Sequence, residues 1–282
     1  MFNGLTRLAW GLWACVIISS TILASTGVAN VFGSDHRQDL FPVPSHLQPI
    51  GVLRSLPDDG NWGTAFLVSE CHIVTAFHVA FPGHKRPGFR PSAKIKSRFN
   101  VGKSADMKSS FFQSSSVATP VSWGKFSSKD YRGLLGDWAI LELDDCLGRI
   151  YGSLSLTPSL QSHMVRGTQI SFAAFPRDRQ EVAGISWEEH CSIKDWGPGS
   201  LVGIDCGVRD GASGGPLLER IEVPDGLGGT SVGFVAVGIA IRELRPRDGI
   251  IDEYHPKFRN IALLSEAFDS ELRVVLNRLK RN

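Results

Sequence analysis

Residues 210–216 form the stretch of this sequence best suited to chemistry. They read Asp-Gly-Ala-Ser-Gly-Gly-Pro, so Ser213 stands among three glycines. Glycine permits positive φ, which can turn backbone N–H groups toward one point beside the serine hydroxyl. An acyl-transfer site needs such donors to hold a developing oxyanion. Ser213 is therefore a candidate nucleophile, and the N–H groups of Gly211 and Ser213 are candidate oxyanion-hole donors.

A serine hydroxyl is a poor nucleophile until a histidine accepts its proton and a carboxylate orients that histidine. The sequence offers both partners. Residues 63–79 predict two apolar strands with a turn between them, and the second strand leads to His78. Asp137 stands at the start of another apolar run. Alone, the serine motif also fits a glycine-rich turn; together with His78 as general base and Asp137 as its orienting group, it predicts a catalytic triad.

Three motifs in this order resemble those of the trypsin/chymotrypsin-like serine proteases, most closely the bacterial trypsin-like branch. They are Thr-Ala-Phe-His at 75–78, Asp-Trp-Ala-Ile-Leu at 137–141 and Gly-Ala-Ser-Gly-Gly-Pro at 211–216. The resemblance covers about residues 48–280. It implies an all-β fold of two six-stranded antiparallel β-barrels with a C-terminal helix. It also implies a serine endopeptidase that acts on polypeptides through an acyl-enzyme intermediate, without a cofactor or a metal ion.

Chain order distinguishes this fold from an α/β-hydrolase, whose nucleophile elbow carries a similar Gly-x-Ser-x-Gly string. In a hydrolase the acid and the histidine follow the serine, and a helix comes directly after it. Here both predicted partners precede the serine, Pro216 follows it closely, and residues 230–241 are typical of a β-strand. Asp252 and His255 do come later, but no βαβ alternation surrounds them. The order therefore favours the all-β fold.

Composition and charge fit a globular protein with a sizeable core. The chain has 282 residues, 42% of them hydrophobic, and a formal charge of +2, which gives no indication of nucleic-acid binding. Residues 81–132 carry eleven Lys and Arg against two Asp. The simplest interpretation is a solvated face, because residues 93–101 alternate and turn Lys94, Lys96 and Arg98 outward. The alternative function is a catalytically weak or silent protease-fold protein that binds a partner through this basic surface.

The first 29 residues read as a signal peptide. Arg7 precedes a mostly apolar run at 8–24, and small residues at 27–29 fit a cleavage site. The mature protein would then be secreted or periplasmic. The alternative is an uncleaved membrane anchor, because seventeen residues are near the lower limit for crossing a bilayer. A membrane is a partner only in that case.

The rest of the chain divides into an arm or linker at 30–47 and a protease domain at 48–282. Within the domain we expect a first barrel at about 48–147, a second at about 166–264 and a helix at about 266–280. The expected strands are 50–55, 93–101, 138–143, 168–175, 186–193, 201–206 and 232–241.

Four cysteines lie outside the N-terminal segment: Cys71, Cys146, Cys191 and Cys206. An even set in an exported chain suggests two disulfides. His78 and Asp137 must touch, so their strands run antiparallel and bring the first two cysteines together. The last two are equidistant from a turn at 198–199 and face each other across a hairpin. We predict the pairs Cys71–Cys146 and Cys191–Cys206, and no zinc site, because no metal-type spacing occurs.

The substrate pocket should be walled by residues just before the serine and by the strand at 238–242. These substrate-binding candidates are Gly207, Val208, Ala240 and Ile241. In the resembled family a carboxylate at the pocket floor selects Lys or Arg, and Gly207 stands at the matching position. We therefore expect a preference for a small or medium apolar residue, unless Arg209, Asp210 or Arg242 reaches into the pocket.

A second departure from the family pattern is Ala212. In the digestive members an aspartate precedes the serine and pairs with the amino terminus freed by propeptide cleavage. Alanine offers no charge for such a terminus. The loop around Gly211 must then be ordered by its own backbone bonding, by the Cys206 disulfide or by bound substrate.

Overall fold

We analysed a computed structural model that describes residues 31–58, 60–103, 112–157, 164–179, 184–224, 229–244 and 253–279. The predicted signal peptide and Asp252 lie outside these residues. In the described part, no helix has the length and apolar character needed to cross a membrane.

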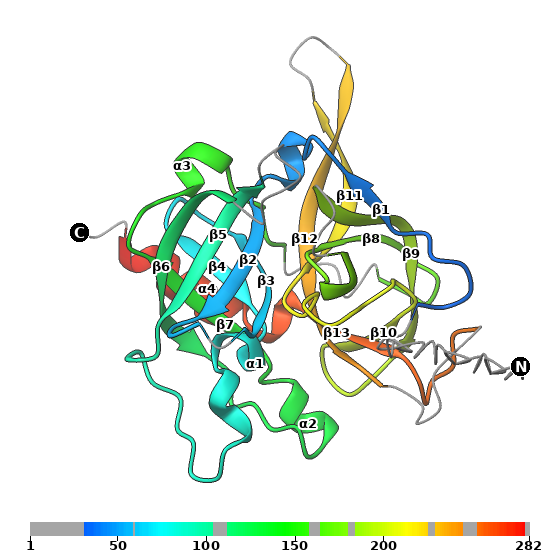
Figure 1. The fold of residues 1–282 in the computed structure, drawn as a ribbon. Coiled ribbons are helices and arrows are strands. Elements are labelled where there is room, and N and C mark those ends of the chain that lie inside the picture. The colour runs from blue at the N-terminus through cyan, green and yellow to red at the C-terminus, as the bar shows by residue number, and fades with distance from the viewer. Residues whose placement is uncertain are drawn as a thin grey trace, which may run out of the picture.

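The first lobe is a closed antiparallel barrel (Figure 1, left) with strand order β2-β3-β4-β7-β6-β5. Its strands are β2 (Ile50–Ser55), β3 (Trp62–Leu67), β4 (His72–Thr75), β5 (Ser97–Lys103), β6 (Phe112–Trp123) and β7 (Ala139–Leu143). Alternate side chains of each strand fill the barrel, such as Leu53, Ile73 and Phe99 at odd positions and Ala118 of β6 at an even one. The period of two in each strand therefore separates the core from the surface.

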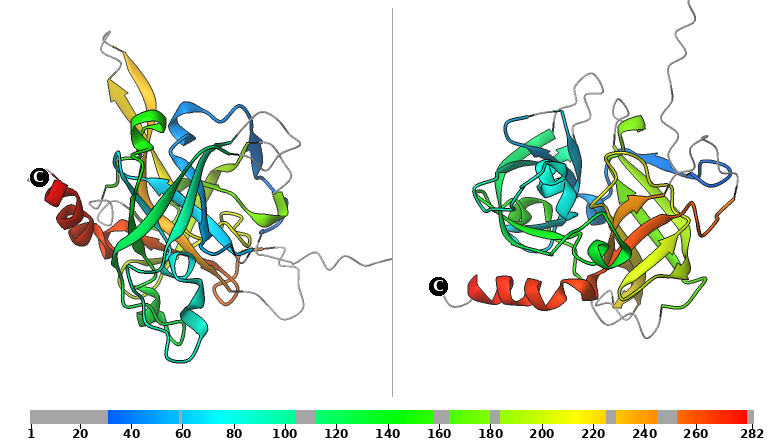
Figure 2. Two further views of the ribbon diagram at one scale, coloured as in Figure 1. Left: turned by 60° about the vertical axis from the view of Figure 1, so that its left-hand side comes forward. Right: turned by 90° about the horizontal axis from the view of Figure 1, so that it is seen from below.

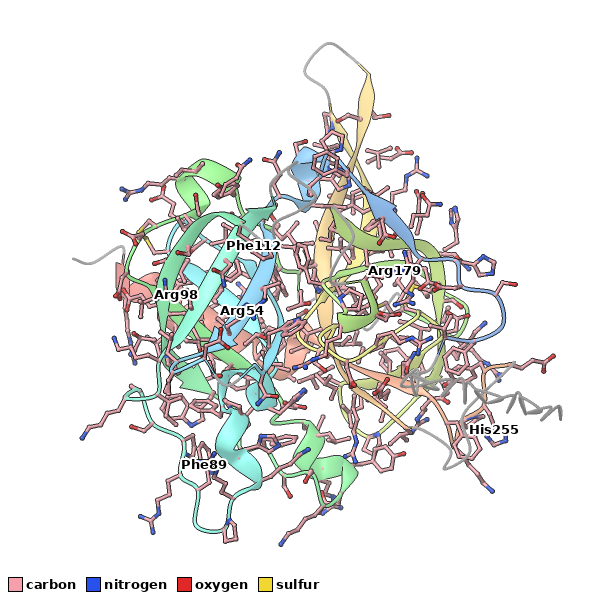
Figure 3. The ribbon with its side chains drawn as sticks, in the orientation of Figure 1. Arg54, Phe89, Arg98, Phe112, Arg179 and His255 are labelled. Atoms are coloured by element: carbon pink, nitrogen blue, oxygen red, sulfur yellow. A yellow bond between two sulfur atoms is a disulfide. The ribbon has the colours of Figure 1, made fainter. Side chains whose placement is uncertain are left out.

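The strand predicted at 93–101 begins later, at Ser97. The backbone N–H of Ile95 donates to the Ser92 carbonyl at 3.0 Å, so a turn occupies the start of the predicted segment. The predicted facing is confirmed within the strand, where Phe99 is buried and Arg98, labelled in Figure 3, is exposed.

The second lobe is also antiparallel (Figure 1, right). Its strands are β8 (Gln169–Ala174), β9 (Ile185–Trp196), β10 (Leu201–Ile204), β11 (Pro216–Pro224), β12 (Thr230–Glu243) and β13 (Asn260–Leu264). They pair in the order β9-β10-β13-β12-β11-β8, and β8 pairs with β9 again. The six strands predicted for this lobe are thus linked in a ring.

A seventh strand, β1 (Gln38–Leu40), joins this sheet from the N-terminal arm. It pairs antiparallel with the start of β9, with Asp39 opposite Ser186. This strand was not predicted, because three residues are too few to show an alternating pattern. Residues 30–47 are therefore more than a connector: part of the arm is a strand of the second lobe.

Helices are few and short. They are α1 (Phe77–Ala80), α2 (Tyr131–Leu134), α3 (Gly148–Tyr151) and the C-terminal α4 (Asp269–Leu279), with 3-10 turns at Ser45–Leu47, Pro82–Lys85, Arg177–Arg179 and Ser265–Ala267. The right-hand view in Figure 2 shows α4 running from the second lobe along the first. Phe268, just before α4, packs on Trp138 of the first lobe at 5.8 Å between ring centroids. The predicted terminal helix is confirmed and helps to join the lobes.

Both predicted disulfides are present. Cys71 bonds to Cys146 with 4.1 Å between Cα atoms, and Cys191 bonds to Cys206 with 4.9 Å. The first links the turn before β4 to the segment after β7, and the second spans the β9–β10 hairpin. Antiparallel pairing of each strand pair brings the cysteines together.

Ion pairs attach the arm to the second lobe beside β1. Arg179, labelled in Figure 3, contacts Asp39 at 2.7 Å and Asp35 at 3.1 Å, and Arg37 contacts Asp35 at 2.7 Å. Burial raises the pKa of Asp35, but hydrogen bonds and attraction from Arg37 and Arg179 lower it more, so that its pKa lies well below the ordinary 3.8. Asp35 is thus ionised throughout the neutral range.

Replacing Asp35 with asparagine should lower the thermal midpoint at pH 7, and the difference from wild type should shrink between about pH 4 and pH 2. A carboxyl whose pKa is depressed on folding stabilises the fold above its unfolded pKa and loses that contribution as the pH falls. Thermal unfolding across this range measures the effect. Asp58→Asn is the control, because its 3.9 Å contact with Arg54 is exposed and should contribute little. A pH-independent difference for Asp35→Asn would contradict the assignment.

Candidate active site

His78 and Asp137 meet where the first barrel faces the second. His78 lies in α1 directly after β4, Asp137 lies just before β7, and these strands pair antiparallel. The Oδ2 atom of Asp137 is 2.9 Å from Nδ1 of His78, and Oδ1 accepts the backbone N–H of His78 at 3.1 Å. Asp137 is 1% exposed, so its carboxyl group is shielded from solvent and both of its oxygens face His78. With Nδ1 donating to the carboxylate, Nε2 is left as an acceptor.

Ser213 and His78 line the same cavity of about 460 Å³. No hydrogen bond joins their side chains within the described residues. Catalytic hydrogen bonds are often long in free proteins and tighten once substrate is bound. The structure therefore brings the predicted nucleophile and base to one cavity.

Backbone hydrogen bonds hold the loop that carries Ser213, both within the loop and to β12. Ala212 donates to the Arg209 carbonyl at 2.8 Å, and Gly214 donates to Ala240 on β12 at 2.7 Å. Gly211 has φ +89°, in the region that favours glycine. Within the described ranges, the N–H groups of Gly211 and Ser213 donate to no protein acceptor. An oxyanion hole requires two such donors, and these lie beside the candidate nucleophile.

Thr64 on β3 braces this loop from the first barrel. Its side chain is fully buried, its Oγ1 donates to the Gly211 carbonyl at 2.9 Å, and it accepts the N–H of Phe175 at 3.0 Å. One hydroxyl thus ties β3 to the loop that carries Ser213 and to the end of β8. Sequence reasoning missed Thr64, because a threonine inside a strand is ordinary and its partners are more than 100 residues away.

Replacing Thr64 with valine should lower kcat about tenfold and the free energy of unfolding by about 2 kcal/mol. The side chain keeps its shape, but the buried Gly211 carbonyl and Phe175 N–H lose a partner, at about 1–3 kcal/mol for each such group. Ser171→Ala is the matched control, since it removes a buried hydroxyl bond to the Glu189 carbonyl away from the site. The control should lose stability and keep kcat. Equal kcat in wild type and Thr64→Val would contradict the bracing role.

Comparison with known proteins agrees with this geometry. The family described as trypsin-like peptidase domain matches residues 63–222, more than half of the chain. The chain belongs to the trypsin-like peptidase family. Among solved structures it is similar to a Glu endopeptidase in complex with MPD, with a TM-score of 0.59 and 16% identity over 87% of this chain and 98% of that chain. That likeness shows the fold, and no curated protein matches the sequence significantly.

A second histidine, His84, lines the cavity of this trypsin-like peptidase. Its ring lies edge-on to His78 with 6.2 Å between centroids, and its Nδ1 is 2.9 Å from the Phe81 carbonyl. Burial lowers the pKa of His84 despite that hydrogen bond, and repulsion from His78 acts in the same direction. His84 is therefore neutral at pH 7. The sequence did not single it out, because it follows the predicted motif within a Pro- and Gly-rich loop.

Only one of the four predicted substrate-pocket residues, Val208, lines the cavity. Gly207, Ala240 and Ile241 are buried and do not belong to its described lining. The cavity is more charged than expected, because the following side chains also line it: Lys85, Arg177, Arg209, Asp210 and Glu243. The cavity lining thus combines the apolar side chain of Val208 with positively and negatively charged side chains.

Proposed function

We propose that the protein is a serine endopeptidase that hydrolyses peptide bonds through Ser213, His78 and Asp137. The observation that carries this proposal is the buried carboxylate of Asp137 on Nδ1 of His78, at 2.9 Å, with Ser213 lining the same cavity as that histidine. A histidine held in this tautomer presents Nε2 as a base, which is the arrangement that activates a serine hydroxyl.

The reaction runs in two halves. Oγ of Ser213 attacks the carbonyl carbon of the scissile bond while Nε2 of His78 accepts the hydroxyl proton, and the carbonyl oxygen becomes negative beside the N–H groups of Gly211 and Ser213. Collapse of this intermediate breaks the C–N bond, and His78 protonates the leaving amine. Water then attacks the acyl-enzyme ester with His78 again as base, which releases the acid and restores Ser213.

The substrate is a polypeptide, as in the family. Gly207 supplies no carboxylate to select Lys or Arg, and Val208 offers an apolar contact to the side chain before the cut bond. Arg209 and Asp210 line the same cavity, so this side chain also meets charged groups. The reaction needs no cofactor. Two disulfides and the apolar segment at 8–24 support a secreted or periplasmic location.

A fluorophosphonate probe tests the function, because it labels serines activated by a neighbouring base. We expect labelling of the folded wild-type protein at Ser213, and no labelling of Ser213→Ala or of heat-unfolded protein. A folded wild-type protein that stays unlabelled would favour the alternative, a catalytically silent protein that binds through the basic surface at 81–132.

A further inference from the structure

Arg37 is a buried arginine in the N-terminal arm. Its side chain is 3% exposed, and its guanidinium contacts Asp35 and Asp178, each at 2.7 Å. Arginine is rarely buried unless its charge is paired, because desolvation of a cation is costly. The two carboxylates come from the arm and from the segment after β8, so this side chain joins parts of the chain 141 residues apart.

The stem of Arg37 packs against the residue that begins the oxyanion loop. A Cβ placed on Gly207 would lie 3.0 Å from Cδ of Arg37, so the arginine occupies the space behind this glycine. The N–H of Gly207 donates to Oε2 of Glu188 at 2.6 Å. Glu188 follows Trp187, whose partner on β1 is Gln38, the neighbour of Arg37. The arm and β9 thus support Gly207 together.

Asp178 provides a second connection to the same loop. Its Oδ2 accepts Arg37 and lies 3.5 Å from Nε of Arg209. The preceding residue, Arg177, donates its backbone N–H to the Asp210 carbonyl at 2.7 Å. The loop is therefore linked to the surroundings of Arg37 at three residues. Gly207 bonds to Glu188, Arg209 lies against Asp178, and Asp210 accepts the N–H of Arg177. These three residues directly precede the candidate donors at 211 and 213.

Arg37 contacts Asp35 and Asp178 directly, and its charge acts on the buried Glu188. Asp35 also pairs with Arg179, and Asp178 lies 3.5 Å from Arg209. Burial raises the pKa of Glu188, and the Gly207 N–H and the charge of Arg37 lower it. Without Arg37, Asp178 would lose its 2.7 Å partner and the buried Glu188 would lose a nearby positive charge, and an uncompensated buried charge is destabilising. The loop is the part that can respond, because Gly207 donates a hydrogen bond to Glu188 and Arg209 forms a 3.5 Å ion pair with Asp178.

We propose that Arg37 is a positioning residue for catalysis, through which the N-terminal arm orders the oxyanion loop at 207–213. This inference rests on the proposed serine-peptidase function. The Arg37 guanidinium bonds to both Asp35 and Asp178, and this two-armed contact takes the place of a charged new terminus near Ala212. Activity then requires the arm from Asp35 onward. It does not depend on which residue upstream of Asp35 is the N-terminus of the mature chain.

The test compares Arg37→Gln with Arg179→Gln. Both remove one arginine from the same cluster, but Arg179 bonds to Asp35 and Asp39 and to none of residues 207–210. Fluorophosphonate titration counts the active sites, and kcat and KM are measured per titrated site on a peptide substrate. We expect Arg37→Gln to lower kcat about 10- to 100-fold with KM changed less than about threefold, since oxyanion donors act in the transition state. Arg179→Gln should keep kcat within about threefold.

Each outcome decides the matter. Wild-type kcat per site in Arg37→Gln overturns the proposal, and so does an equal loss in both variants, which would mean only that the cluster stabilises the fold. If Arg37→Gln does not fold, Arg37→Lys keeps the charge and loses the two-armed contact; lowered kcat at unchanged KM supports the proposal, and wild-type kcat overturns it. Failure of the wild-type protein to react with the probe or cleave peptide overturns the serine-peptidase function instead.

Discussion

Replacing Ser213 with alanine should lower kcat for peptide hydrolysis by about 10⁴- to 10⁶-fold without unfolding the protein. The hydroxyl makes no hydrogen bond with His78 in the described structure, so its loss leaves the surrounding contacts in place. Initial rates in a preparation free of other peptidases, together with thermal unfolding, measure both parts of this expectation. Wild-type activity in Ser213→Ala would refute the mechanism.

The proposed mechanism uses Ser213, His78 and Asp137 as a unit, so the losses from single replacements should not add. Removing His78 or Asp137 alone is expected to cost a similar order of magnitude, and Ser213→Ala combined with His78→Ala should lose little more than the worse single change. His84→Gln is the matched control. It alters a second histidine of the same cavity and should keep kcat within about tenfold, because its Nδ1 contacts the Phe81 carbonyl and not Asp137. Losses that multiplied would mean that the residues act independently.

Replacing Gly214 with alanine should destabilise the protein by about 2–5 kcal/mol and abolish most activity. Its φ of +85° already disfavours a side chain, by about 1–2 kcal/mol. An added Cβ would also overlap the Thr64 carbonyl and the Thr75 hydroxyl, and overpacking costs a further 1–3 kcal/mol or so. Because Gly214 follows the nucleophile and bonds to Ala240 at 2.7 Å, any relief must move Ser213.

Gly60→Ala separates the backbone contribution from the overlap. Gly60 has φ +76°, close to that of Gly214, but nothing lies within 4 Å of the added Cβ. The control should lose only about 1–2 kcal/mol and retain kcat. Chemical unfolding at equilibrium gives both free energies. If the two variants lost equal stability, the close approach of Gly214 to Thr64 would not matter.

Sequence analysis could identify those candidate site residues that each stand in a short, recognisable motif. His78, Asp137 and the glycines around Ser213 stand in strings whose residue types chemistry restricts, and the cysteine pairs follow once those strings fix which strands are antiparallel. The expected barrel strands could be predicted because side chains alternate between the core and the solvent along each strand. This alternation can be seen within a short stretch of sequence.

The parts that it did not predict depend on contacts between distant segments. Thr64 reaches Gly211 across 147 residues, and Arg37 reaches Asp178 across 141. Neither residue type is unusual in its own neighbourhood, so no local pattern marks it. The substrate pocket was only partly predicted for the same reason: which side chains near Val208 face the cavity depends on how the two lobes meet.

Strand β1 also has a consequence for how the chain folds. Gln38 pairs with Trp187, so this contact closes a loop of about 150 residues, and long loops close late because their closure carries a high entropic penalty. During synthesis the arm emerges early and must wait until the first lobe, β8 and the start of β9 have been made behind it. Meanwhile the start of β9 presents an open sheet edge, which can pair with another chain. Newly made protein should therefore be most prone to strand-exchanged association just before the arm docks.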